Sequence, residues 1–359
     1  MFISEKVSIE DLIQSFDQEK VNWLMIAEHS NISITELIDQ SNKRGYTIAG
    51  GIFPMVIYDQ QSYEKGIVLK TIQTTQAPIL VPDIGSVSRE DLPIIDEKDR
   101  SCIILLDGLS DTIPSFLDHI YEKYGNTISY VGAGAGSLTL QQSPCIFTNE
   151  GLFENAAVLL MASNEVSLGV KHGWEKISGP YVANKTDGNR IVELNWRPAF
   201  DVYKEVVEAS CQKKFKEDNF FDIAKGFPFG IYREGQEDIV RDPISVDESG
   251  ALMCVGQVSQ NTSLNILKGD KDNLVSCAKE AANQSLHDGK SDVFVVDCIS
   301  RILYLEEGFK EELDVINSVV REKDDRMELE GILSLGEISS GQDGFLELYN
   351  KTIVVSSFR

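Results

Sequence analysis

A pattern of apolar and polar positions recurs three times along the chain. In its first occurrence, the apolar run Val21–Ala27 predicts a buried strand. A helix is predicted next, because Ser33 and Glu36 form a capping box and Gly45 is a typical helix stop. The helix has one apolar face, and two strand-like runs close the unit: Ile34, Leu37 and Ile38, then Tyr46–Gly51 and Gly66–Thr71.

The second and third occurrences follow the same order. The second begins with Cys102–Asp107 and the third with Asp292–Asp297, both apolar runs that end in aspartate. Pro114 lies in the first turn of the second helix, where its missing N–H group costs nothing. In the second unit, the helix face is Phe116, Leu117, Ile120, Tyr121 and Tyr124, and the strand-like runs are Ile128–Gly136 and Ala156–Met161. In the third unit, the helix face is Phe309, Leu313, Ile316 and Val320, and the strand-like runs are Gly331–Gly336 and Thr352–Val355.

These strand–helix–strand–strand units predict an α/β or α+β fold, in which mixed sheets are covered by helices. Between the second and third units we expect short strands followed by helices, one starting near Pro198 and another over Leu274–Ala281. The turn-rich segment Phe227–Gly230 is predicted to separate two domains, residues 1–226 and 227–359. A length of 359 residues agrees with two domains.

Composition narrows the classes of partner. With 57 acidic and 33 basic residues, the formal net charge of −24 would repel nucleic acid and anionic membrane surfaces. The start of the chain lacks the basic and apolar regions of a signal peptide, and no apolar run reaches the roughly 20 residues of a membrane span. Six scattered cysteines form no Cys-x-x-Cys pair, which is typical of reduced thiols. We therefore expect a cytoplasmic protein that binds neither nucleic acid nor membrane.

A glycine-rich run, Gly132–Gly136 (GAGAG), follows a predicted strand. A dinucleotide site would need a helix to begin there, so that its N-terminus could bind the pyrophosphate. The sequence that follows, SLTLQQSPCIFTNE, predicts a strand or loop instead. The glycines therefore indicate a close approach of the backbone, with the space needed by a small ligand or by another strand.

His172 stands out because it lies between two glycines and beside a tryptophan, in the segment VKHGWE. No two histidines have the spacing of a zinc site. A single histidine can still be the axial ligand of a non-covalent haem. The alternative is an imidazole in a half-buried sheet that is hydrogen-bonded to the backbone, and both interpretations stay open.

Two arginines are candidates for binding an anion. Arg241 follows an apolar run and Arg301 follows a strand end, and neither belongs to a solvated run of charges. A guanidinium held near a strand end presents a donor fork that suits a carboxylate or phosphate. The alternative is a structural ion pair with one of three nearby acidic residues: Asp242, Asp297 or Glu337.

Cys298 ends the first strand of the third unit, and Arg301 follows it closely. A guanidinium nearby could lower the pKa of the thiol and make it a nucleophile, with His172 brought close by folding. The alternative is a half-buried structural cysteine at a strand end. A cysteine-dependent enzyme is therefore one of the hypotheses.

Short motifs follow one another in a fixed order along the chain. The first group is Gly169–Pro180 (GVKHGWEKISGP), Val182–Ala183, Gly188–Val192, Leu194, and Arg197–Phe200 with Tyr203. The second group is Phe227–Ile231 (FPFGI), Val240–Asp242, Cys298–Arg301 (CISR), Gly336–Glu337 and Tyr349–Thr352. In their order and spacing, the two groups resemble the N-terminal and C-terminal parts of the FIST sensory family, and the resemblance runs from about residue 20 to the end of the chain.

This resemblance implies a cytoplasmic sensor of signal transduction that binds a small molecule, amino acids being the usual suggestion, and is not an enzyme. Some family members look like haem proteins that sense nitric oxide and regulate a histidine kinase. No kinase, cyclase or chemoreceptor motif is visible here, so we expect the signal to pass through a separate partner protein such as a histidine kinase.

One departure from the family pattern concerns the first glycine turn. Relatives resemble Gly-Cys-Ser-Thr-x-Gly there, whereas this chain has Ala49–Pro54 (AGGIFP), without the hydroxyls and the thiol. This difference implies another ligand or another binding place. The HGW segment is similar across the family and not in its haem proteins alone, which favours a structural or pocket-lining role for His172.

The leading hypothesis is a binding site for an anionic or amino-acid-like metabolite. Arg241 and Arg301 are predicted to bind the negative group, with Glu337 and Asn350 as polar partners and Trp174 as an apolar wall. Cys298 and His172 complete the candidate residues. Haem sensing through His172 and catalysis by Cys298 are the alternatives.

Overall fold

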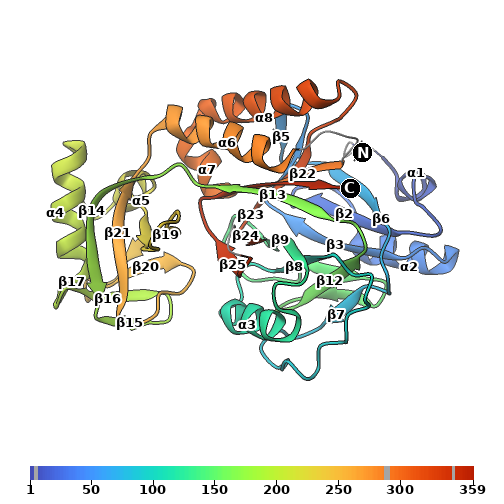
Figure 1. The fold of residues 1–359 in the computed structure, drawn as a ribbon, viewed down its shortest axis with the longest axis horizontal. Helices are drawn as coiled ribbons and strands as arrows, with labels where there is room; N and C mark the ends of the chain where they lie inside the picture. The colour runs from blue at the N-terminus through green and yellow to red at the C-terminus, as the bar shows by residue number, and fades with distance from the viewer. Residues whose placement is uncertain (4–6, 287–291, 342–343) are drawn as a thin grey trace.

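The structure is a computed structural model that describes residues 1–3, 7–286, 292–341 and 344–359. It has two compact parts (Figure 1). We call residues 175–268 the insert, and the described residues before and after it the three-unit body. Both chain termini lie in the body (Figure 1).

The first unit of the body confirms the predicted strands and helix. The side chain of Ser33 accepts a hydrogen bond from the N–H group of Glu36, and Gly45 ends the helix with a φ of 74°. In chain order, the elements are β2 (Val21–Ala27), α2 (Ile34–Arg44), β3 (Ile48–Phe53), β4 (Met55–Tyr58), β5 (Gln61–Tyr63) and β6 (Ile67–Ile72).

The second and third units repeat this order, again as predicted. The second consists of β8 (Ser101–Asp107), α3 (Ile113–Tyr124), β9 (Ser129–Ala135), β10 (Ile146–Thr148), β11 (Gly151–Phe153) and β12 (Ala157–Ala162). The third consists of β22 (Asp292–Cys298), α7 (Ile299–Leu305), α8 (Phe309–Lys323), β23 (Glu330–Ser334), β24 (Glu337–Ser340), β25 (Leu346–Tyr349) and β26 (Ile353–Phe358).

Each unit contributes one central parallel pair, β2–β3, β8–β9 or β22–β23, but the units exchange their hairpins in a cycle. The hairpin β4–β5 joins the third sheet beside β23, β10–β11 joins the first sheet beside β3, and β24–β25 joins the second sheet beside β9. The three units are therefore interlocked. The outer strands do not follow this cycle, because each pairs with the last strand of the unit that it precedes in the chain: β1 (Phe2–Ile3) with β6, β7 (Ile79–Val81) with β12, and β13 (Val166–Lys171) with β26.

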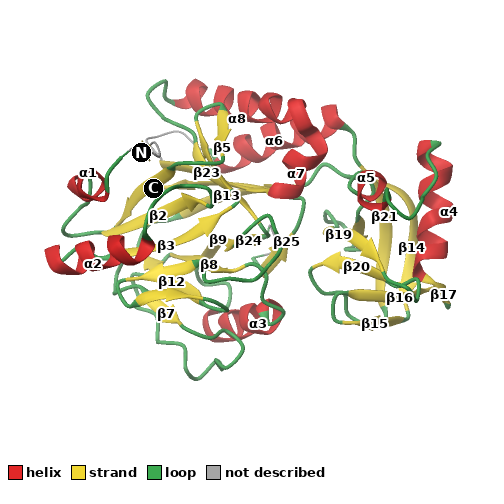
Figure 2. Cartoon of the chain, turned by 180° about the vertical axis from the view of Figure 1, so that it is seen from behind, coloured by secondary structure: helices red, strands yellow, loops and turns green. Residues whose placement is uncertain are grey.

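The three sheets turn one apolar face toward a shared core, to which all three units contribute. Their other faces are covered on the outside by α1 (Ile9–Gln14) and α2, by α3, and by α6 (Lys271–Ser285) with α7 and α8 (Figure 2). No helix in the described part of the chain is both long and apolar enough to cross a membrane.

The glycine-rich run lies in β9 up to Ala135, and the predicted close approach of the backbone is confirmed. A Cβ atom on Gly132 would lie 2.0 Å from the carbonyl oxygen of Ile104, and one on Gly134 would lie 2.8 Å from Cα of Gly108. The N–H group of Gly134 donates to the carbonyl of Gly336 at 2.8 Å. A neighbouring strand and turn therefore occupy the space at these two glycines, and no helix follows to form a dinucleotide site.

The insert is an eight-stranded antiparallel sheet with its own apolar core against two helices. The segment Phe227–Gly230 lies inside this sheet, because β18 pairs with both β19 and β21. The predicted domain limits of 1–226 and 227–359 thus do not follow the two compact parts. The elements are β14 (Glu175–Ala183), β15 (Lys185–Asp187), β16 (Arg190–Leu194), β17 (Arg197–Pro198), α4 (Ala199–Cys211), α5 (Phe220–Ala224), β18 (Phe229–Ile231), β19 (Ile239–Val246), β20 (Leu252–Val255) and β21 (Thr262–Lys268).

The chain passes between the body and the insert twice, just before β14 and just after β21. Trp174 and Gly269 lie at these crossings, and a Cβ atom on Gly269 would lie 2.4 Å from the indole ring. The indole also packs on Tyr304 with a centroid distance of 5.0 Å, and its Nε1–H donates to the carbonyl of Lys351 at 2.9 Å. Both crossings are therefore packed against the third unit.

Candidate functional site

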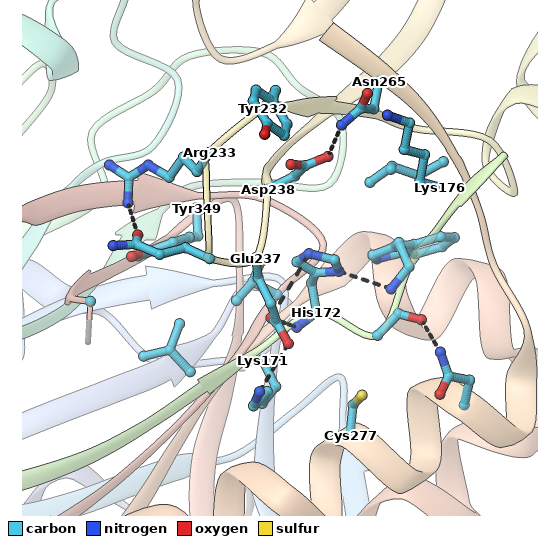
Figure 3. A pocket seen from close by; sticks show the side chains of 18 of the residues that line it. Lys171, His172, Lys176, Tyr232, Arg233, Glu237, Asp238, Asn265, Cys277 and Tyr349 are labelled. Atoms are coloured by element: carbon cyan, nitrogen blue, oxygen red, sulfur yellow. Dashed lines mark hydrogen bonds and ion pairs between the residues drawn. The ribbon is translucent and has the colours of Figure 1, made fainter. Parts of the chain in front are cut away.

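A cavity of about 690 Å³ lies between the body and the insert (Figure 3). This volume is within the range of small-molecule sites. The body supplies the end of β13 with the residues that follow it, part of α6, Gly341, and Tyr349 with Thr352. The insert supplies the loop between β18 and β19 and residues of β14 and β21. The charged and polar residues of the wall are Lys171, His172, Lys176, Tyr232, Arg233, Gln236, Glu237, Asp238, Asn265, Asn273, Cys277, Tyr349 and Thr352.

His172 forms part of the cavity wall and is 7% exposed. Its Nδ1 accepts a hydrogen bond from the backbone N–H of Trp174 at 2.8 Å, so the ring proton of the neutral form is on Nε2. Burial lowers the pKa of His172, although Glu237 acts in the opposite direction. The imidazole is therefore neutral at pH 7, with Nε2–H turned toward the Glu237 carboxylate at 3.8 Å.

These contacts do not fit a haem ligand. Iron would need the lone pair of Nε2, and the proton would then have to move to Nδ1, where the N–H of Trp174 already donates. Nε2 is also buried, and the Glu237 carboxylate lies 3.8 Å from it. The geometry around His172 thus agrees with the alternative of a backbone-bonded imidazole.

Glu237 joins the insert to the body across the cavity. One of its carboxylate oxygens accepts a hydrogen bond from Nζ of Lys171 at 3.0 Å, and the other accepts from the backbone N–H of His172 at 3.2 Å. From the same loop, Arg233 forms an ion pair with Glu347 of β25. Asp238 instead accepts from Asn265 within the insert, at 2.7 Å. Figure 3 shows Lys171, Arg233, Glu237, Asp238 and Asn265 around the hollow.

Arg301, a predicted ligand-binding residue, is fully buried outside the cavity wall. Its Nε donates to Glu312 at 3.1 Å and its Nη2 donates to the other oxygen at 2.5 Å, while Nε lies 3.3 Å from Asp297. The remaining donors reach the backbone carbonyls of His172, Leu274 and Lys351. These contacts of the guanidinium correspond to the alternative of a structural ion pair. In this conformation, they give no support to the prediction that Arg301 binds a ligand.

Arg241 and Asn350 lie together, but also outside the cavity wall. Arg241 is 8% exposed, and its Nε donates to the carbonyl of Gln257 at 2.9 Å. Its Nη1 donates to the carbonyls of Val240 and Leu348 at 2.9 and 3.3 Å. Arg241 thus connects the insert to β25, and the structure gives no support for its predicted contact with a ligand.

Glu337 and Cys298 are neighbours in the buried interior of the third unit. Burial raises the pKa of Glu337 to about 8, although the carboxylate accepts hydrogen bonds from Oγ of Ser334 at 2.8 Å and from N–H of Thr352 at 3.2 Å. Burial also raises the pKa of the Cys298 thiol, and Glu337 adds to the effect. A protonated, 3% exposed thiol is a poor nucleophile.

Of the seven predicted site residues, the structure places only His172 and Trp174 in the cavity wall. Lys351 is not among the predicted site residues, although it lies inside the Tyr349–Thr352 motif. It is fully buried, with Nζ 3.2 Å from Asp242 and 4.9 Å from the centroid of the Trp174 ring. A lysine two residues before the apolar run of β26 is a signal of burial. Glu237 was missed because an acidic residue in a polar turn has no such signal.

Among the described residues, no three His, Cys, Asp or Glu side chains lie close enough together to bind a metal ion. Cys277 is the cysteine in the cavity wall, and burial raises the pKa of its thiol too. The site therefore offers hydrogen bonds and charges of both signs to a ligand.

Two family models match the chain. The FIST N domain matches residues 24–197, and the FIST C domain matches residues 199–340. The two matches meet inside the insert, close to β17, so the predicted limit at 226 stays a prediction. No curated protein matches the chain. Together the two matches span most of the sequence, and the chain belongs to the FIST family of sensory domains.

Proposed function

We propose that this protein is a sensor that binds a small anionic or amino-acid-like metabolite in the cavity between the body and the insert. The observation that carries the proposal is the composition of the cavity wall, which brings Lys171, Arg233, Glu237 and Asp238 around one hollow. A zwitterion or a polar anion finds partners of both signs there, whereas an apolar ligand would cover these charged side chains without offering them a hydrogen bond.

Lys171 and Glu237 are the central residues of the proposed site. Their ion pair, at 3.0 Å, spans the hollow between the body and the insert. A ligand carboxylate can compete with Glu237 for Lys171, and a ligand ammonium can compete with Lys171 for Glu237. Binding then changes the contacts that join the two parts, which is the differential interaction that a sensor requires.

The proposal includes the way in which the signal leaves the protein. The protein acts in the cytoplasm, without catalysis of its own, and a separate protein such as a histidine kinase reads the ligand-bound state. The raised pKa of the Cys298 thiol supports a role without catalysis. The contacts of His172 favour the metabolite over haem as the ligand.

Thermal shift tests the proposal with the standard amino acids and small dicarboxylates as the panel. At 100 times Kd, a ligand that binds only the folded state stabilises it by about 2.7 kcal/mol, which should raise the unfolding midpoint by about 5 °C. Glu237→Gln should weaken the response at least tenfold in concentration. Glu234→Gln is the matched control, because Glu234 belongs to the same loop but is exposed and outside the cavity wall. A panel without any shift, or equal responses of both variants, would contradict the proposed site.

A further inference from the structure

The hairpin between β16 and β17 carries an unusual residue at its tip. Leu194 pairs with Arg197, so Asn195 and Trp196 form a two-residue turn. Both have a positive φ, 48° and 60°, as in the type I′ turns that normally carry glycine at the second position. A side chain in this left-handed region costs roughly 1 kcal/mol, and tryptophan is a bulky residue to place there.

The turn is fixed by hydrogen bonds to the neighbouring strand β14 and its end. The N–H of Asn195 donates to the carbonyl of Val182 at 2.9 Å, and the Asn195 side chain accepts from the N–H of Val182 at 2.8 Å. The N–H of Trp196 donates to the side chain of Asn184 at 2.7 Å. The position of the Trp196 backbone is therefore set before any partner arrives.

The indole of Trp196 projects into solvent. It is 75% exposed, whereas the other two tryptophans of the chain, Trp23 and Trp174, are 1% and 4% exposed. Arg197 and Pro198 beside it are also exposed, and Arg197 is held by Glu205 through two contacts of 3.0 and 2.5 Å. Tryptophan and arginine are the residues enriched most at the centres of protein interfaces.

Charge is distributed unequally over the two parts of the chain. The insert has 15 acidic and 12 basic residues, which leaves 42 acidic and 21 basic residues for the rest. The hairpin lies at the outer edge of the insert, away from the acidic body (Figures 1 and 2). A protein that docks there meets a nearly neutral surface, whereas nucleic acids and anionic membranes are repelled by the molecule as a whole.

We propose that Trp196, with Arg197 and Pro198, is the docking site for the signalling partner, and that the partner is a protein with an apolar pocket that takes the indole. The inference rests on the proposed function for the existence of a partner, although it does not depend on which ligand fills the cavity. Because the contact is apolar and the insert is nearly neutral, the affinity should change less than about threefold between about 0.05 and 0.5 M salt.

The test compares the wild type with Trp196→Gly, and uses Ile94→Gly as the control because Ile94 is 84% exposed on the body. Trp196→Gly should fold, with an unfolding midpoint equal to or up to about 3 °C above that of the wild type, since glycine suits a positive φ. Proteins from a lysate of the encoding organism that the immobilised wild type retains, but bare resin does not, are identified by mass spectrometry and then tested on Trp196→Gly and Ile94→Gly. The most enriched one is purified and serves as the probe in a titration.

The expected result is a Kd about 30-fold weaker for Trp196→Gly, a smaller loss for Trp196→Phe, and a change of less than about twofold for Ile94→Gly. A partner that binds Trp196→Gly as tightly as the wild type, or a lysate with no protein that tells them apart, overturns the proposal. Two further results also overturn it: a wild-type dimer that Trp196→Gly dissociates in sedimentation, which would make the occupant a second copy, and binding to phosphatidylcholine vesicles that Trp196→Gly abolishes. A missing ligand response alone would count against the cavity and leave this docking site intact.

Discussion

Replacement of Arg301 by methionine should destabilise the protein strongly. The substitution keeps a long side chain but leaves Asp297 and Glu312, both fully buried, without their cation. Breaking a buried ion pair from one side costs about 3–5 kcal/mol, and the three backbone carbonyls that lose a donor add to the cost. At about 1–2 °C per kcal/mol for a chain of this length, the unfolding midpoint should fall by about 5–8 °C.

The pH dependence identifies the cause of this loss. Burial raises the pKa of Asp297, and the guanidinium of Arg301 opposes this effect, so without Arg301 the folded variant binds a proton at Asp297 that the unfolded chain does not. The stability of Arg301→Met should therefore rise as pH falls from about 8 to about 5, and the gap to the wild type should narrow.

Urea unfolding at a series of pH values measures both effects, and Arg301→Met with Glu312→Leu should recover part of the stability. Two results would contradict this prediction: an unfolding midpoint of Arg301→Met within about 2 °C of the wild type at pH 8, or a loss in the free energy of unfolding that is the same at every pH. A stable variant that has lost only its response to ligand would restore the role predicted from the sequence.

Three further predictions concern other buried groups. The pKa of Glu337 is about 8 in the folded protein, so its carboxyl keeps a proton that the unfolded chain loses at lower pH. The free energy of unfolding of the wild type should therefore fall by up to about 1.4 kcal/mol per pH unit as the pH rises from about 5 to about 8, and Glu337→Gln should flatten that slope in urea titrations. Cys298 should resist iodoacetamide in the native protein and react in denaturant, and rapid native labelling would revive a catalytic role. Gly269→Ala should lower the unfolding midpoint by several degrees, because its Cβ would lie 2.4 Å from Trp174 and 2.6 Å from Tyr304; an unchanged midpoint would mean that this junction relaxes freely.

The elements of the body could be predicted from the sequence because each unit has a long apolar strand and a helix with one apolar face. The exchange of hairpins could not. Strands such as β10 and β24 have three and four residues, too few to show a period of their own. Their partners are set by tertiary packing around the shared core, which local patterns do not record.

The candidate site shows the same limit. Arg301 attracted notice because an arginine beside an apolar strand is unusual, and the structure agrees that it is special, although as a buried ion pair. The sequence pattern marks such a charge as non-solvated but does not tell a protein carboxylate from a ligand carboxylate. The cavity wall depends on Glu237 and Arg233, which lie in a polar turn and meet the body only because the insert folds back on it.

Alkylation of Cys277 tests the central claim most directly, because this thiol lies in the cavity wall. Cys211, partly exposed at the end of α4 and outside the wall, is the internal control. In iodoacetamide at about pH 8.5, the panel compound that stabilises the protein best, at 10 times its Kd, should slow labelling of Cys277 about tenfold and leave Cys211 unchanged. Equal labelling rates of Cys277 with and without a compound that demonstrably binds would place the ligand elsewhere and contradict the account.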